Sequence, residues 1–313
     1  MSSDGRAIRT QGVLTQLPSE PPVVSVIMVV FRTGPVLFDS ITHVLAEALV
    51  DEFVLVDNGS VPQDGARLRA LAEAEPRIRL LQGHGNIGFA RGCNLGAGAA
   101  KGHWILILNP DAYLKPGCLE ALIEGGKGFP NPCVVGARVL NTDGSEQRGA
   151  RRGEVTPLTT LLSLTRLACL PGLRKYEIHK DCDTPPVAPV AVSTISGSCF
   201  LMSRQDYQRL DGFDEGYFLH VEDIDLCWRA RKAGGSVVFQ PKAVVLHEGS
   251  TSHASSLQVE LHKGKGLVRF FLKRAESFPA LMLAVLLSPL ILLASMLRPF
   301  VRGLLGPARG RLG

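Results

Sequence analysis

Short apolar runs alternate with longer helical stretches over the first 125 residues. The apolar runs are rich in β-branched residues and lie at residues 23–30, 52–56, 77–81 and 104–108. The helical stretches lie between them, at residues 36–48, 64–75 and 89–100. Continuous apolar runs of this length predict strands buried on both faces, as in a parallel sheet. The alternation therefore predicts an α/β fold with a doubly wound, mostly parallel, Rossmann-like sheet.

The pattern loosens after residue 125. Residues 142–189 carry a basic cluster, a leucine-rich piece and then Pro185, Pro186 and Pro189, and we interpret them as an insertion that faces the acceptor or a membrane. Regular structure is expected again at residues 190–203, in a helix that begins near Glu222, and in short strands near Val237 and Val244.

The C-terminal segment differs from the rest of the chain in both charge and hydrophobicity. Residues 278–297 contain no charge, and twenty helical residues are just long enough to cross a bilayer. A buried core helix is the alternative, but the basic flanks favour a membrane segment, which either spans the bilayer or lies in it. Residues 263–313 hold nine basic residues and one acid, whereas the whole chain has a net charge of +5. The rest is therefore mildly acidic, which predicts an anionic membrane surface as a partner and no nucleic acid.

The cysteines and the composition of the N-terminus indicate the cellular compartment. The seven cysteines are odd in number and form no CxxC pair, which argues against a disulfide framework and a structural zinc site. Residues 1–22 are polar and lack the apolar core of a secretory signal, so we expect a flexible leader. Both features favour a reducing compartment and a cytosolic catalytic part.

Polar residues follow the predicted strands, where ligands of a doubly wound sheet gather. One such segment is Asn109-Pro110-Asp111, whose carboxylate should emerge into the cleft and could hold a cation such as Mg²⁺. The same three residues also suit a simple turn. Gly83, Gly85 and Gly88 form a GxGxxG pattern typical of dinucleotide binding, but they follow the third strand rather than the first.

Acidic residues mark the helix expected near residue 222. Glu222, Asp223 and Asp225 fall in its first turn, where they either complement the helix dipole or supply a base for a hydroxyl proton. His247 follows a predicted strand and is either structural or a ligand for the same cation.

Five motifs together resemble family 2 of the glycosyltransferases, inverting enzymes of GT-A fold, over residues 23–265. The motifs are Val56-Asp57-Asn58-Gly59-Ser60, the segment from Gly85 to Asn94, Leu108-Asn109-Pro110-Asp111-Ala112, Gly197-Ser198 before Phe200-Leu201-Met202, and Gly212-Phe213-Asp214-Glu215 leading into Glu222-Asp223-Ile224-Asp225. Asn109 stands in place of the first acid of the family's DxD metal motif, as in a rhamnosyltransferase-like subgroup. That departure leaves one carboxylate fewer for the metal.

The resemblance implies a role for each matching residue. The resemblance assigns nucleotide binding to Asp57, Asn86, Gly88, Arg91 and Asn94. It assigns the binding of a divalent metal, Mg²⁺ or Mn²⁺, to Asp111 and His247. Asp223 is the expected base, with Glu222 beside it in the catalytic pair. We place Gly197, Asp225 and Arg151 on the acceptor side.

The expected activity is an inverting transfer of a sugar from a nucleotide-sugar donor to a lipid-linked or polysaccharide acceptor in cell-envelope glycan synthesis. The subgroup resemblance favours dTDP-L-rhamnose, and a UDP-hexose donor, an inactive GT-A scaffold and a dinucleotide-dependent oxidoreductase are the alternatives. The expected organisation is a leader (1–22), a GT-A domain (23–265, with a nucleotide-binding half 23–125 and an acceptor half 126–265) and a membrane-associated tail (266–313). The tail would attach the enzyme to the cytoplasmic face of the membrane.

Overall fold

The computed structural model describes residues 24–249, 251 and 255–305. The expected leader, Ser250 and tail positions 306–313 lie outside the described residues. The strands are β1 (Val24–Val30), β2 (Val50–Asp57), β3 (Ile78–Leu81), β4 (Trp104–Leu108), β5 (Ala112–Leu114), β6 (Cys133–Leu140), β7 (Arg151–Arg152), β8 (Val190–Ala191), β9 (Thr194–Ile195), β10 (Cys199–Ser203) and β11 (Ser236–His247). The helices are α1 (Val36–Leu45), α2 (Pro62–Ala74), α3 (Phe89–Ala99), α4 (Cys118–Gly125), α5 (Pro157–Leu164), α6 (Arg204–Arg209), α7 (Glu222–Lys232), α8 (Ser256–Arg274) and α9 (Phe278–Leu305), with short 3₁₀ turns η1 (Leu167–Cys169) and η2 (Arg174–Tyr176).

Nine strands of the described chain form one sheet in the order β3-β2-β1-β4-β10-β6-β11-β5, with β8 beside β11. Strands β3, β2, β1 and β4 are parallel, whereas β10 runs antiparallel between β4 and β6. Strands β7 and β9 form a separate antiparallel ladder. The α/β fold with a central sheet of mostly parallel strands is thus confirmed, and the reversal at β10 marks the start of its second half.

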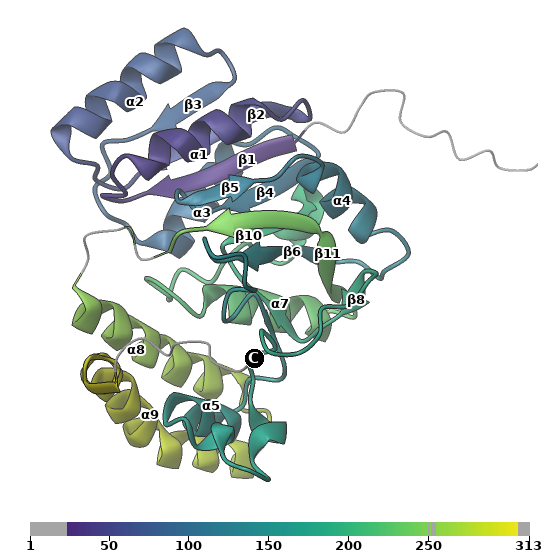
Figure 1. The fold of residues 1–313 in the computed structure, drawn as a ribbon, viewed down its shortest axis with the longest axis vertical. Helices are drawn as coiled ribbons and strands as arrows, with labels where there is room; N and C mark the ends of the chain where they lie inside the picture. Colours follow the sequence, from purple (N-terminus) through teal and green to yellow (C-terminus); the bar gives the residue numbers. More distant parts are fainter. Residues whose placement is uncertain (1–23, 250, 252–254, 306–313) are drawn as a thin grey trace, which may run out of the picture.

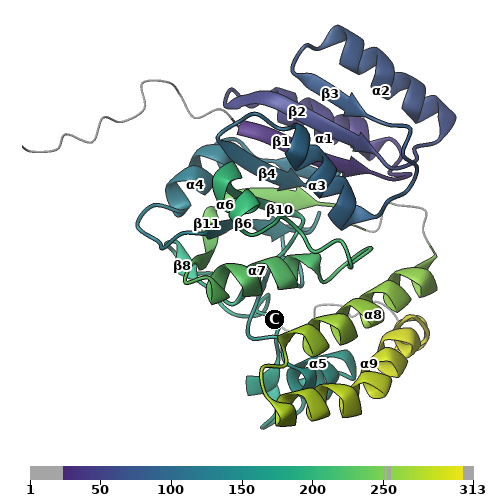
Figure 2. The same ribbon diagram turned by 180° about the vertical axis from the view of Figure 1, so that it is seen from behind.

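Helices cover both faces of this sheet (Figures 1 and 2). Side chains of α1 and α4 pack on one face, and those of α3, α6 and α7 pack on the other. Every residue of β1 is buried, as its apolar run, interrupted only by Ser25, predicts for a central strand. The two apolar clusters, one on each face, therefore hold the sheet in place. They also fix the edge at which the polar loops after the strands lie.

A second layer, made of α5, α8 and α9, lies beside the sheet layer (Figures 1 and 2). Its own apolar cluster joins Leu267, Phe270 and Phe271 of α8 to Ala284 and Ile291 of α9. The same cluster includes Val221 and Ile224 at the start of α7, so the layer packs directly on that turn. The expected boundary between residues 265 and 266 falls inside α8.

Strand β11 replaces the two short strands expected near Val237 and Val244. It is continuous over twelve residues, and its register with β6 shifts between Gln240 and Val244. Pro241 lies in this interval and has no N–H for the ladder, which is the physical reason for the irregularity. The sequence expectation of two strands was wrong because a bulge looks like a strand end in an apolar pattern.

Candidate active site

A strained turn positions the acidic pair at the start of α7. His220 and Val221 both have positive φ, 67° and 77°, a region that β-branched residues such as valine rarely adopt. The Val221 side chain is buried, and a Cβ on Gly266 of α8 would lie only 3.0 Å from it. The helical layer thus presses on the turn and holds it in a conformation that it would not adopt alone.

Asp223 is buried and accepts three hydrogen bonds. Its Oδ2 accepts from the Arg152 guanidinium and from the Gly197 amide, both at 3.0 Å, and its Oδ1 accepts from the Ile224 amide at 2.8 Å. Burial acts to raise the pKa of Asp223, but Arg152 and the two amides outweigh it and lower that pKa. A carboxylate offers about four acceptor positions, so Oδ1 keeps one for a substrate hydroxyl.

Glu222, its neighbour, is in the opposite electrostatic state. Its side chain is buried, and its Oε2 has no hydrogen-bond partner among the described residues. Burial first, and then the charge of Asp223, raise the pKa of Glu222 to about 8. At neutral pH the pair therefore carries one negative charge, and that charge lies on Asp223.

Asp111 and His247 meet at the edge of the sheet, next to Asn109. Asp111 Oδ1 lies 3.0 Å from His247 Nε2, and Asp111 Oδ2 accepts from Thr251 at 2.8 Å. The segment is also a turn, since the Ala112 amide donates to the Asn109 carbonyl at 3.2 Å. Burial would raise the pKa of Asp111, but the contacts with His247 and Thr251 lower it.

The hydrogen bonds around His247 suit a metal ligand. Gln147 Oε1 lies 2.6 Å from Nδ1, which places a ring proton on Nδ1, and the Asn109 amide nitrogen lies 3.2 Å from Nε2. Nε2 faces the Asp111 carboxylate, and a proton or a cation between the two atoms would satisfy both. Within the described chain no three His, Cys, Asp or Glu side chains gather at one point. These two residues would hold a divalent cation only in part, and its remaining ligands would come from substrate phosphates and water.

A cavity of about 540 Å³ lies between the sheet layer and the helical layer, and we call it the interlayer cavity. Glu222, Asp223, Gly197 and His247 line it on the sheet side. The residues lining it elsewhere include Arg148, Arg152, Val155, Leu164, Ile178, His179, Glu260, Lys263, Leu267 and Arg298. One space therefore connects the acidic pair, His247 and a set of basic side chains.

Arg151 does not line this cavity, and its neighbour Arg152 does. The Arg151 guanidinium donates to Glu146 and to the Asp183 carbonyl, both at 2.6 Å, in a buried ion pair. Successive residues of a strand point to opposite faces, and β7 directs Arg152, not Arg151, towards Asp223. Arg152 therefore lines the interlayer cavity, whereas Arg151, the residue expected on the acceptor side, does not.

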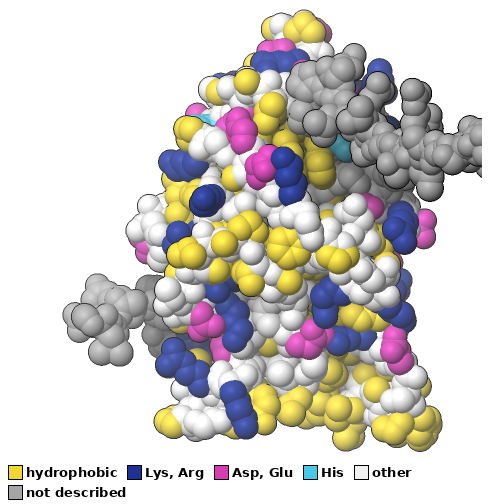
Figure 3. Space-filling model, turned by 90° about the vertical axis from the view of Figure 1, so that its right-hand side faces the viewer, with side chains coloured by type: hydrophobic (Ala, Val, Ile, Leu, Met, Phe, Trp, Pro, Cys, Tyr) yellow, Lys and Arg dark blue, Asp and Glu magenta, His cyan; other side chains and the backbone are white. Residues whose placement is uncertain are grey.

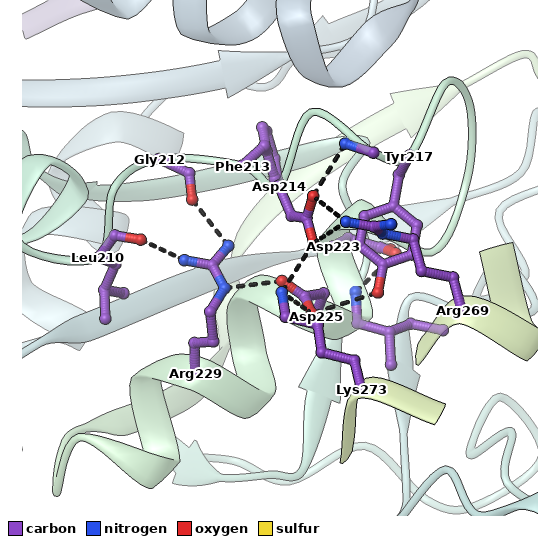
Figure 4. Close-up of polar contacts among 12 residues, drawn as sticks. Leu210, Gly212, Phe213, Asp214, Tyr217, Asp223, Asp225, Arg229, Arg269 and Lys273 are labelled. Carbon is purple, nitrogen blue, oxygen red and sulfur yellow. Dashed lines mark hydrogen bonds and ion pairs between the residues drawn. The ribbon is translucent and has the colours of Figure 1, made fainter. Parts of the chain in front are cut away.

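Asp225 also lies away from the cavity, inside a network of ion pairs (Figure 4). Its carboxylate accepts from Arg229 at 2.7 Å, from Lys273 at 2.8 Å and from the Tyr217 hydroxyl at 3.2 Å. Lys273 also contacts Asp214, at 2.8 Å, and so ties α8 to the loop before α7. Burial acts to raise the pKa of Asp214, but its cationic partners Lys273 and Arg269 lower that pKa to about 2. Asp225 therefore ties α7 to α8 and does not line the interlayer cavity.

The residues expected at the nucleotide lie outside the interlayer cavity, along the ends of β2 and β3 and at the start of α3. Asp57 Oδ1 accepts from the Gly59 and Ser60 amides, at 3.0 and 2.7 Å. Asn86 accepts from the Gly88 amide at 3.1 Å, and a side chain on Gly88 would meet the Phe218 carbonyl at 2.6 Å. This close approach joins the loop after β3 to the turn before α7.

Arg91 and Asn94 of α3 both contact the Gly212–Glu215 loop. Arg91 is exposed, 3.5 Å from Glu215. The Asn94 amide is committed to protein contacts, because it accepts from the Tyr207 hydroxyl at 2.7 Å and from the Phe213 amide at 2.9 Å. Asn94 therefore ties α3 to that loop.

Sequence reasoning missed Arg148, Arg152, Lys263 and Arg298 as cavity residues. The first two belong to a basic cluster that was visible in the sequence, but nothing local indicated which arginine faces inward. The other two were visible only as part of a basic tail. No signal along the chain shows that α8 and α9 fold back over Asp223.

Comparison with known proteins decides the family. The profile of Glycosyl transferase family 2 matches residues 25–210. The chain belongs to this family. An N-acetylglucosaminyl-diphospho-decaprenol L-rhamnosyltransferase of Mycobacterium tuberculosis (strain H37Rv) is 30% identical over 250 residues, which cover 74% of this chain and 77% of that protein. The rhamnosyltransferase WbbL of Escherichia coli K12 is 36% identical over 76 residues, 24% of this chain and 28% of WbbL.

Solved structures agree on the fold. The crystal structure of GalNAc-T7 with UDP, GalNAc and Mn²⁺ has a TM-score of 0.61 at 15% identity, over 83% of this chain and 49% of that one. The mannosyltransferase PcManGT from Pyrobaculum calidifontis, in complex with GDP-Man and Mn²⁺, has a TM-score of 0.56 at 16% identity, over 93% and 77%. The glycosyltransferase has the GT-A fold that the resemblance predicted. The family match includes Gly83 to Gly88, which decides against the dinucleotide interpretation of that pattern.

Proposed function

We propose that this glycosyltransferase moves L-rhamnose, with inversion, from dTDP-L-rhamnose to a hydroxyl of a lipid-linked N-acetylglucosamine acceptor at the cytoplasmic face of a membrane. The observation that carries the proposal is the position of Asp223, ionised and with a remaining acceptor position, in a cavity that also reaches His247. The mycobacterial relative supports the donor sugar and the acceptor, because its name specifies both.

Asp223 acts as the base in this proposal. The acceptor hydroxyl donates to Oδ1 and loses its proton there as its oxygen attacks the anomeric carbon. Arg152 and the Gly197 amide hold the carboxylate in place through Oδ2, and they keep it ionised. The protonated neighbour, Glu222, adds no second negative charge beside the base at neutral pH.

The leaving nucleoside diphosphate requires neutralisation at the other end of the reacting bond. Asp111 and His247 would hold a divalent cation, Mg²⁺ or Mn²⁺, which supplies that positive charge when bound. Gln147 orients the imidazole for this task, and Thr251 orients the carboxylate. Asp57, Asn86 and Gly88 would shape the site for the nucleotide at the adjoining strand ends.

Helix α9 supports attachment to a membrane. Its segment Phe278–Phe300 is the helix within the described residues that is long and apolar enough to cross a bilayer, and only 17% of its most apolar window is buried. Its exposed side chains include Met282, Leu286 and Leu293. Apolar side chains gather at the end of the molecule formed by α5 and α9 (Figure 3).

The packing of α9 favours a position in the plane of the membrane surface rather than across it. Arg298 contacts Glu260 at 3.3 Å, and Leu292 and Ser295 pack on Gly264, so α9 runs back along α8. Helix α8 carries Lys265, Arg269 and Lys273, and each charge at the bilayer centre would cost about 3 kcal/mol. An interfacial helix with basic neighbours avoids this cost and is attracted to anionic lipids, which are enriched in the cytoplasmic leaflet.

A thermal-unfolding series with nucleoside diphosphates tests the donor. At one hundred times its dissociation constant a ligand adds about 2.7 kcal/mol to the stability. We expect dTDP with Mg²⁺ or Mn²⁺ to raise the midpoint more than UDP does, and radiolabelled rhamnose to move to a lipid-linked acceptor. A larger shift with UDP, together with transfer from a UDP-hexose, would replace the donor assignment.

A further inference from the structure

Four basic side chains from separate parts of the chain converge on the interlayer cavity. They are Arg148 after β6, Arg152 of β7, Lys263 of α8 and Arg298 of α9. All four act on His179, which lines the same cavity and whose Nδ1 has no hydrogen-bond partner among the described residues. Burial and then these four charges lower the pKa of His179 to about 2. The cations therefore face one common region and are not scattered over the wall.

Carboxylates balance part of this charge. Arg152 pairs with Asp223 at 3.0 Å, Arg298 with Glu260 at 3.3 Å, and Arg148 with Glu177 at 3.5 Å. The Arg148 contact is long and uses one nitrogen of a guanidinium that has five N–H donors. A phosphate group is a suitable partner for such a fork, and Lys263 adds a compact point charge from the opposite layer.

The composition of the wall changes between the base and the membrane-facing helices. Asp223 and Gly197 lie on the sheet side, whereas Lys263 and Arg298 belong to the helices that carry the apolar surface. Leu164, Ile178 and Leu267 add apolar groups to the wall of the same cavity. A hydroxyl-bearing sugar, an anionic linker and a hydrocarbon chain would each find matching side chains in one space.

We propose that Arg148, Lys263 and Arg298 form a subsite for the diphosphate that joins the acceptor sugar to its lipid. The subsite rests on the proposed function, and it deepens that function by assigning the anionic part of the acceptor to named residues. We do not assign Arg152 to the subsite because it contacts Asp223, the proposed base. With the diphosphate held at α8 and α9, the sugar reaches Asp223 while the lipid chain leaves along the apolar surface of the helical layer.

Two water-soluble acceptors distinguish binding at the diphosphate subsite from binding of the acceptor sugar. Both carry N-acetylglucosamine and the same short alkyl chain, one through a diphosphate and the other as a simple alkyl glycoside. The full chain is assayed in neutral detergent, which presents no anionic surface. We expect a KM for the diphosphate acceptor at least tenfold lower than for the glycoside.

Lys263→Gln should raise the KM for the diphosphate acceptor about tenfold, the usual scale for one lost charge-assisted contact. It should leave the KM for the glycoside and for the donor unchanged, and Lys263→Arg should restore most of the loss. Lys265→Gln is the matched control, because Lys265 is exposed on the same helix and does not line the cavity.

Each contrary outcome has a distinct meaning. Equal use of the two acceptors by the wild type would overturn the subsite and leave the proposed function intact. A rise in both KM values with Lys263→Gln, or an equal effect of Lys265→Gln, would also overturn it. Absence of rhamnose transfer to either acceptor, or to the natural lipid-linked acceptor, would overturn the proposed function and the subsite together.

Discussion

Replacement of Glu222 by glutamine tests the electrostatic state of the acidic pair. The wild-type carboxyl is buried beside Asp223, and its Oε2 has no hydrogen-bond partner in the described part of the chain. Its pKa is about 8, against an ordinary value of 4.5. Glutamine has nearly the same shape and does not ionise, so Glu222→Gln removes the titration while the packing of α7 is kept.

The size and direction of the effect follow from linkage. A carboxyl whose pKa is raised by folding contributes its full stability below pH 4.5 and loses it as the pH rises through about 8. One proton changes the free energy of unfolding by about 1.4 kcal/mol per pH unit, which amounts to roughly 3 to 5 kcal/mol over this window. The Gln variant should therefore gain stability relative to the wild type as the pH increases. The cost of the new buried amide is the same at every pH and does not affect the slope.

Urea unfolding at a series of pH values measures this slope. The two tryptophans, Trp104 in β4 and Trp228 in α7, report on the sheet and on the helix that carries the pair. Glu73→Gln, at an exposed position of α2, is the matched control for the loss of a carboxylate. A stability difference between Glu222→Gln and the wild type that stays constant from pH 4.5 to 8 would refute the reasoning.

Three further predictions concern the reaction. Asp223→Asn should lower turnover by about 10² or more with donor affinity kept, because only the base is lost; a weaker donor affinity at unchanged turnover would show a binding role instead. Asp111→Ala should abolish transfer and the metal-dependent part of nucleotide binding measured by calorimetry, and wild-type turnover in this variant would remove Asp111 from the site. A chain ending at Ser277 should keep Mg²⁺-dependent donor binding, since Asp111 and His247 lie at the sheet edge, but should lose transfer to lipid-linked acceptors with α9 and Arg298. Loss of donor binding on truncation would show that α9 belongs to the core of the nucleotide-binding half.

Local patterns along the chain were sufficient for most of the fold. β1 is buried on both faces, so all of its residues except Ser25 are apolar and the strand can be predicted from the sequence. The same logic located β2, β3 and β4 and the helices between them. It failed at β11, because Pro241 interrupts the ladder without ending the strand. It also could not separate Arg151 from Arg152, since alternation in a two-residue strand gives no indication of which side chain faces inward.

The sequence by itself determined the α/β class, the family motifs and the residue types of the site, because each of these depends on short-range spacing or on local periodicity. Only the tertiary structure decided which of these residues meet. Asp111 and His247 are 136 residues apart and come together because β5 pairs with β11. The acids of the Glu222–Asp225 segment separate into a cavity pair and an ion-pair network because successive positions on α7 face different neighbours. The cavity itself exists because α8 and α9 fold back on the strained turn before α7, and contacts between segments so far apart in the chain leave no local pattern in its sequence.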